Sequence, residues 1–165
     1  MKKPMQKLPA NDDVLLKQIF KLLQERIDAN PYGLDGEFAA RLQSLPRGLR
    51  AMAATHHLDV SLTLDDIGWH FLNFGHESHV REAVAGLTEL GIPEIGTMLL
   101  EAYEIVLPLL SDIRVPDDYY ECLQRTGHAE QIKKLTNKAV NLLGSKGIYP
   151  FWIAYARSHP ENVFN

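Results

Sequence analysis

The sequence predicts an all-α protein, a single-domain bundle of about seven helices with short connections. Apolar residues recur at three- and four-residue spacing along most of the 165 residues, which is typical of helices that bury one face. Glycine and proline stand where these segments begin and end, and no segment alternates apolar and polar residues as a half-buried strand does. We therefore expect residues 1-165 to form one helical domain, with residues 1-10 as a flexible N-terminal segment.

Capping residues give the order of the helices. Asn11 or Asp12 caps the first helix, which ends before Pro31. Pro46 and Pro93 stand where a first helical residue would, and Thr63-Leu64-Asp65-Asp66 is typical of a cap with acidic residues in the first turn. The predicted helical segments run from about 12 to 29, 37 to 43 (a short turn), 46 to 60, 63 to 74, 77 to 90, 93 to 107, 116 to 125, 128 to 143 and 148 to 155.

Charge is unevenly distributed along the chain, although the net charge is only −4. Residues 1–60 carry nine Lys/Arg and seven Asp/Glu, residues 61–122 carry two and twelve, and residues 123–165 carry six and two. The middle of the chain is therefore strongly acidic and both ends are mildly basic. An acidic surface attracts basic partners, and direct nucleic-acid binding is not expected.

Five carboxylates are the candidate partner-binding residues of this acidic middle. Val80, Ala83, Val84 and Leu87 define the core face of the 77–90 helix, so its glutamates are expected to point away from the core. The alternative is that Lys133, Lys134 and Lys138 of the later helix fold across and neutralise the patch. The candidate residues are Asp65, Asp66, Glu82, Glu89 and Glu101.

Histidines form the second candidate site, because five of the seven lie between His56 and His79. Histidine is a common metal ligand and acid–base group. His70, His76 and His79 are the alternative metal ligands, and a hydrolase or a metal-binding protein could be built on the His56–His79 cluster. The spacing matches no metal motif, so we interpret these histidines as separate side chains and predict no metal and no cofactor.

The remaining motifs do not indicate a catalytic site. Gly144-Ser145-Lys146-Gly147 lacks the phosphate-loop pattern, and the single cysteine, Cys122, lies in an apolar and aromatic context that favours a buried thiol. One cysteine allows no internal disulfide, and the N-terminus has no apolar signal segment, so the prediction is a cytoplasmic protein that does not enter a membrane. The aromatic segment from Tyr149 to Tyr155 packs either inside the chain or between subunits of a homo-oligomer.

Residues 45-107 carry a family resemblance. The pattern runs Leu45-Pro46-Arg47-Gly48-Leu49-Arg50, then His57 to Val60, then Ile67 to Asn73, then Ala83 to Gly91, and ends on Leu99-Leu100-Glu101-Ala102. It resembles the bacterial DNA-mimic-protein family, a helical domain mostly of unknown function. The resemblance implies an all-α fold and surface carboxylates that imitate DNA phosphates and bind a DNA-binding protein.

The leading hypothesis is therefore a non-enzymatic helical protein-interaction module that binds a basic or DNA-binding protein through an acidic central surface. The alternative is the metal-binding protein or hydrolase built on the histidines.

Overall fold

The computed structural model describes residues 8–28, 31–32 and 36–165, and every regular element in this part of the chain is a helix, without a strand. The all-α prediction is confirmed. The described residues form ten α-helices and one 3₁₀ turn, more than the seven or so expected. The helices are α1 (Asp12–Arg26), α2 (Glu37–Leu42), α3 (Arg47–Leu64), α4 (Phe71–Phe74), α5 (Glu77–Glu89), α6 (Pro93–Val106), α7 (Pro116–Thr126), α8 (Ala129–Leu143), α9 (Tyr149–Ser158) and α10 (Glu161–Phe164), with η1 (Leu107–Leu109) after α6.

The predicted starts of the first helix and of the helix at Pro116 are confirmed by capping contacts. The Asn11 side chain accepts a hydrogen bond from the amide of Val14 at 3.0 Å, and the Asp118 carboxylate accepts from the amides of Arg114 and Val115 at 2.8 and 3.1 Å. These acceptors satisfy backbone donors that have no partner within the helix. Capping chemistry therefore explains the starts of α1 and α7.

The predicted helix over 63–74 is wrong in its extent. Helix α3 continues to Leu64, and the second helix of this region is only α4. The cause is Asp66, whose Oδ1 accepts from the amides of Gly68 and Trp69 at 2.9 and 2.7 Å. These bonds stabilise a turn before α4 rather than a helix that begins at Asp65.

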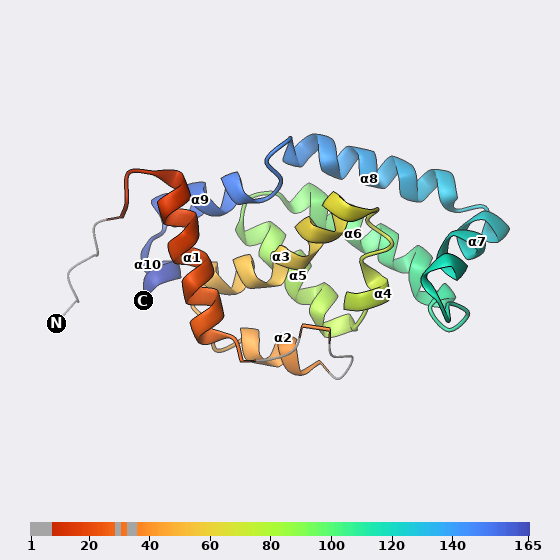
Figure 1. The fold of residues 1–165 in the computed structure, drawn as a ribbon, viewed down its shortest axis with the longest axis horizontal. Helices are drawn as coiled ribbons and strands as arrows, with labels where there is room; N and C mark the ends of the chain where they lie inside the picture. The colour runs from red at the N-terminus through yellow and green to blue at the C-terminus, as the bar shows by residue number, and fades with distance from the viewer. Residues whose placement is uncertain (1–7, 29–30, 33–35) are drawn as a thin grey trace.

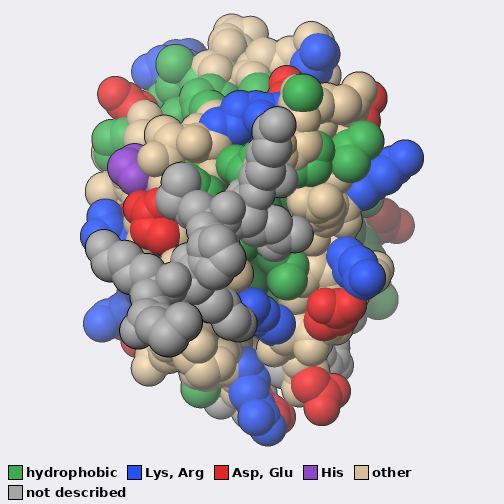
Figure 2. All heavy atoms as spheres, turned by 90° about the vertical axis from the view of Figure 1, so that its left-hand side faces the viewer, with side chains coloured by type: hydrophobic (Ala, Val, Ile, Leu, Met, Phe, Trp, Pro, Cys, Tyr) green, Lys and Arg blue, Asp and Glu red, His purple; other side chains and the backbone are tan. Residues whose placement is uncertain are grey.

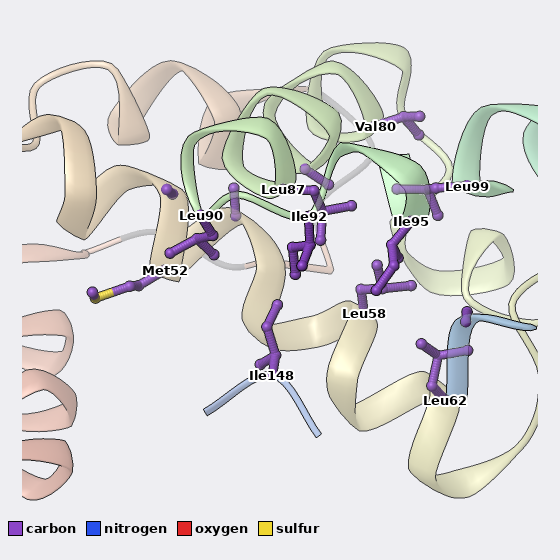
Figure 3. Packing of buried hydrophobic residues seen from close by; sticks show 14 of the residues in the cluster. Met52, Leu58, Leu62, Val80, Leu87, Leu90, Ile92, Ile95, Leu99 and Ile148 are labelled. Atoms are coloured by element: carbon purple, nitrogen blue, oxygen red, sulfur yellow. The ribbon is translucent and has the colours of Figure 1, made fainter. Parts of the chain in front are cut away.

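The core is built around α3, α5 and α6. Helix α5 packs between the other two: a Cβ on Gly86 would lie 2.9 Å from the Ala51 carbonyl oxygen of α3, and a Cβ on Gly96 of α6 would lie 3.5 Å from Val84 of α5. Figure 3 shows Leu58 of α3 beside Ile95 of α6, with Ile148 approaching α3 from the other side. Leu58, Ile95 and Ile148 are all buried.

The other helices lie around this centre (Figure 1). Helices α1, α9 and α10 gather at one end, where α9 packs on α1 and α10 packs on α3. Helix α8 runs along one side and packs on α6, while α7 lies at the far end. One cluster of buried apolar residues includes members from Leu15 of α1 to Val163 of α10.

Two expectations fall partly outside the described residues: most of the predicted flexible segment 1–10, and part of the loop around Asp35. Within the described ranges, every helix is too short or too polar to cross a lipid bilayer.

Candidate functional site

The first candidate surface contained Glu82, and its predicted orientation is wrong. Glu82 was expected to point away from the core, but it is buried, with 9% of the residue exposed. Arg50 of α3 donates from Nε and Nη2 to its two carboxylate oxygens at 2.7 and 2.6 Å. The reason is that α5 has two buried faces. The apolar stripe faces α6, and the face bearing Gly86 and Glu82 packs on α3.

Glu89 is likewise engaged inside the chain. Arg47 Nε lies 2.5 Å from one carboxylate oxygen, and the Tyr155 hydroxyl of α9 donates to the other. Burial acts to raise the pKa of Glu89, but the hydrogen bonds from Arg47 and Tyr155 outweigh it and lower that pKa. Both arginines and both glutamates line a surface hollow of about 390 Å³. The carboxylates are thus neutralised by α3, and not by the lysines of α8.

Asp65 and Asp66 tie the α3–α4 connection to α7. The hydroxyl of Tyr119 donates to Asp66 Oδ1 at 2.7 Å, and the hydroxyl of Tyr120 donates to Asp65. Burial raises the pKa of Asp66, although its three hydrogen-bond donors oppose that shift. Asp66 therefore has a local structural role, and its Oδ1 is already occupied by three donors.

Of the five predicted residues, Glu101 is exposed and, like the exposed Asp65, has no cationic partner among the described residues. It accepts a hydrogen bond from Gln131 of α8 at 2.8 Å. No ion pair within 4.0 Å joins Lys133, Lys134 or Lys138 to a carboxylate in the described part of the chain. The remaining acidic surface is therefore smaller than the sequence suggested.

That surface is the outer face of α6, which we call the α6 face. Its exposed residues include three glutamates and two leucines, and the leucines are 41% and 49% exposed. A helix turns roughly 100° per residue, so Leu100 and Leu107 lie along one edge and Glu94 and Glu101 along the other, with Glu104 between them. The α6 face consists of Glu94, Leu100, Glu101, Glu104 and Leu107.

Charge on the opposite end of the molecule is arranged differently. Figure 2 shows the face that carries α1, where Lys and Arg side chains are interspersed with Asp and Glu. Arg157 of α9 pairs there with Asp12, and Lys21 pairs with Glu25. No single sign of charge prevails on the part of that face that the structure describes.

Three histidines meet in the interior, although the sequence interpretation treated them as separate. The ring centroids of His57 and His79 lie 6.1 Å apart, and those of His70 and His79 lie 6.5 Å apart. Phe38 of α2 and Phe74 of α4 pack between and beside the rings. We call His57, His70, His79, Phe38 and Phe74 the histidine cluster.

The three histidines named as alternative metal ligands therefore do not come together in the structure. His76 does not join His70 and His79, because its Nδ1 caps α5 and lies 2.7 Å from the Ser78 hydroxyl. His57 of α3 is the third ring instead, and it packs against the rings of Phe38 and Phe74. The described residues contain no group of three His, Cys, Asp or Glu side chains arranged to hold a metal ion.

Burial keeps the histidine cluster neutral. It lowers the pKa of His57 and of His70 to about 3, and that of His79 to about 4, and neighbouring histidines lower each pKa further. His57 Nδ1 and His79 Nε2 are buried without a hydrogen-bond partner. Among the described residues, no acidic side chain therefore accepts a hydrogen bond from either atom.

Ser61 and His70 are within hydrogen-bond distance, but they do not form a hydrolytic pair. The Ser61 hydroxyl lies 2.9 Å from the His57 carbonyl oxygen and 2.9 Å from His70 Nδ1. The carbonyl can only accept, so a hydroxyl that donates to it receives its second bond from the Nδ1–H of His70. That direction is opposite to the activation of a nucleophile, and both residues are buried.

The aromatic C-terminal segment packs mostly within the chain. Trp152 is fully buried and donates from Nε1 to Thr55 at 3.1 Å, and Tyr155 is buried against α3 and α5. Tyr149 and Phe20 complete an aromatic group around Trp152. Trp152 and Tyr155 are therefore not available to a subunit interface.

Comparison with known proteins gives no relative: no protein-family model, no curated protein and no solved structure matches this chain.

Proposed function

We propose that this protein is a non-enzymatic interaction module that binds a basic segment of another protein on the α6 face. The observation that supports this most directly is the composition of that face. Glu94, Glu101 and Glu104 are exposed beside two exposed leucines, and no ion pair within 4.0 Å involves these glutamates in the described chain. A row of negative charges beside an apolar surface suits a basic amphipathic helix. The basic side chains of such a helix would pair with the glutamates, and its apolar side chains would cover the two leucines.

The family resemblance points to a narrower form of the same proposal, in which the basic partner is a DNA-binding protein. The remaining carboxylates favour a short contact rather than an extended imitation of DNA, because Glu82, Glu89 and Asp66 are engaged within the chain. The buried cluster that extends from α1 to α10 supports a single functional domain. We assign it to the cytoplasm because its one cysteine, Cys122, is free and buried.

The test is affinity capture from the source cells with two matched variants. One replaces Glu94, Glu101 and Glu104 by Gln, and the control replaces Asp13 by Asn and Glu25 and Glu161 by Gln. Both remove three negative charges, but the control changes α1 and α10. We expect a basic protein that is retained by the wild type and the control, is lost from the α6 variant, and elutes as salt shortens the Debye length below about 8 Å.

Identical sets of retained proteins for the two variants would contradict the proposal. Retention of the partner at high salt by the wild type would also contradict it, because the charge complementarity would then contribute nothing.

A further inference from the structure

We propose that the histidine cluster is an acid-triggered latch that holds α2 and α4 against α3 and α5. This role is separate from the α6 face. Three imidazole rings from different elements meet at one point, where His70 and His79 are buried and His57 is half-buried. Phe38 of α2 and Phe74 of α4 pack against these rings. Two ring nitrogens at this point have no hydrogen-bond partner, so an N–H formed there by protonation finds no acceptor among the described residues.

The contacts of the two phenylalanines identify the parts that the latch holds. Phe38 of α2 has its ring centroid 4.9 Å from that of His79 and 5.7 Å from that of His57. Phe74 of α4 has its centroid 4.6 Å from His57 and 5.0 Å from His70. Both phenylalanines are buried. Loss of this contact would remove the aromatic side chain that holds α2 and one of the two that hold α4, the other being Phe71 against Tyr103.

Helices α2 and α4 depend on such anchoring more than their neighbours do. They have six and four residues, whereas α3 and α5 have 18 and 13. Isolated helices this short are not stable in water, so packing alone maintains them. Local opening begins where fewest contacts oppose it, and α2 and α4 fit that description.

Protonation opposes the closed arrangement in two ways. A charged imidazole loses its hydration when the cluster is closed, and a second charge about 6 Å away adds repulsion. A phenylalanine face attracts one cation, but that attraction is small compared with the burial of several charges. Opening α2 and α4 admits water to the charged rings and removes both penalties.

The charged and titratable groups around the cluster do not compensate. His56 of α3 and His76 before α5 are themselves basic, and they act to lower the pKa values of His57 and His79. Asp59 of α3 is engaged elsewhere, since its Oδ1 accepts from the Ile148 amide at 2.8 Å. Tyr32 faces the cluster, with its ring centroid 6.2 Å from that of His57 and 5.2 Å from that of Phe74. The other titratable groups on the packed elements are engaged with one another or with the core: Glu37 pairs with Arg41, Glu77 with Arg81 and Glu82 with Arg50, and Tyr103 contacts Phe71.

The experiment is hydrogen exchange of the full chain, read by mass spectrometry at about pH 7.5 and about pH 5, with the intrinsic rate corrected. We expect exchange in α2 and α4 to accelerate by at least about tenfold at the lower pH, while α6 and α8 stay protected. Unchanged protection of α2 and α4, or equal loss in every helix, would overturn the latch.

A matched pair of variants separates the cluster from general acid effects. His57→Phe with His79→Phe replaces the two residues that have an unpartnered nitrogen and keeps aromatic rings in place. His159→Phe changes an exposed histidine outside the cluster. The double variant is expected to lose the pH response of α2 and α4, and the control to keep it. If the double variant does not fold, a proton NMR titration of the wild-type imidazoles is the deciding experiment. The cluster histidines and the α2 amides must then change together with pH. Independent changes would refute the latch.

Discussion

Arg50 on α3 binds Glu82 on α5 through two parallel hydrogen bonds, with Nε at 2.7 Å and Nη2 at 2.6 Å from the two carboxylate oxygens. The Glu82 side chain is 10% exposed and that of Arg50 is 36% exposed. The pair therefore joins the two central helices through a buried acid and a half-buried base. The two members are not equivalent, because only the acid depends entirely on its partner for solvation.

This asymmetry predicts unequal effects of mutation. Arg50→Ala leaves Glu82 buried without a cation and is expected to lower the free energy of unfolding by about 3 kcal/mol. Glu82→Gln leaves a half-exposed arginine and is expected to lower it by about 1 kcal/mol. Urea denaturation at neutral pH measures both values.

The control for this prediction is Arg81→Ala, which removes an exposed pair with Glu77 on the same helix. Such pairs contribute about 0.5 kcal/mol or less. Equal losses for Arg50→Ala and Arg81→Ala would show that the buried carboxylate does not depend on Arg50.

A second prediction concerns the distance between α3 and α5. A Cβ on Gly86 would lie 2.9 Å from the carbonyl oxygen of Ala51, which is backbone and cannot move aside as a side chain would. Gly86→Ala is therefore expected to lower the free energy of unfolding by about 1–3 kcal/mol. Gly96 of α6 is the matched helical glycine, because its Cβ would meet Val84 at an ordinary 3.5 Å.

Gly96→Ala is expected to raise the free energy of unfolding by up to about 1 kcal/mol, since alanine favours a helix over glycine. Thermal denaturation of the two variants should therefore shift in opposite directions. A stabilising effect of Gly86→Ala would mean that the two helices are not in close contact there.

The sequence was informative about elements and less informative about their neighbours. Periodicity and capping predicted α1, α5, α6 and α8 closely, because both signals are local to a helix. The same reasoning wrongly placed Glu82 at the surface, because the apolar stripe of α5 was taken to be the only buried face of that helix. A helix between two others has two buried faces, and the second can carry Gly86 and a paired acid. The one feature of the sequence that could have indicated a counter-ion for Glu82 is Arg50, the fourth residue of α3.

The histidine cluster shows the same limit in another form. His57 lies on α3, His70 before α4 and His79 on α5, so their meeting depends on tertiary packing. The sequence interpretation treated the histidines as separate and named His76 with His70 and His79 only as an alternative set of metal ligands. A backbone capping contact holds His76 elsewhere. The spacing of the histidines in the sequence also did not indicate how deeply each ring is buried, and burial sets the pKa of each imidazole.

A third prediction is that stability falls on mild acidification. Burial lowers the pKa of His70 to about 3 and that of His79 to about 4 in the folded protein, below the 6.5 of an ordinary histidine. The unfolded chain therefore binds protons first as pH falls. The two neutral histidines therefore do not reduce stability above about pH 6.5. Below that pH the free energy of unfolding decreases, by up to about 2 kcal/mol for each histidine at about pH 5. Opening of the latch would limit the loss.

Denaturant unfolding at several pH values checks this, with His79→Phe as the comparison. The carboxylate of Glu89 also loses stabilising contacts in acid, so the informative quantity is the difference between wild type and variant. That difference should change by up to about 2 kcal/mol between about pH 7.5 and about pH 5. Parallel curves for the two proteins would refute the assignment to His79.

The last prediction is that the histidine cluster binds no metal. Zinc held by imidazoles requires each ligating nitrogen at about 2.0–2.1 Å, with three or four donors converging on one point. Here Nδ1 of His70 is engaged with Ser61, His76 caps α5, and the cluster lacks a carboxylate or thiolate ligand among the described residues. Elemental analysis of protein purified without chelator should give well under about one metal ion per chain, and zinc should not raise the melting temperature. The prediction would be contradicted if one metal ion per chain raised the melting temperature of the wild type and of His159→Phe but not that of His79→Phe. The metal would then be bound by the cluster and not by an exposed histidine.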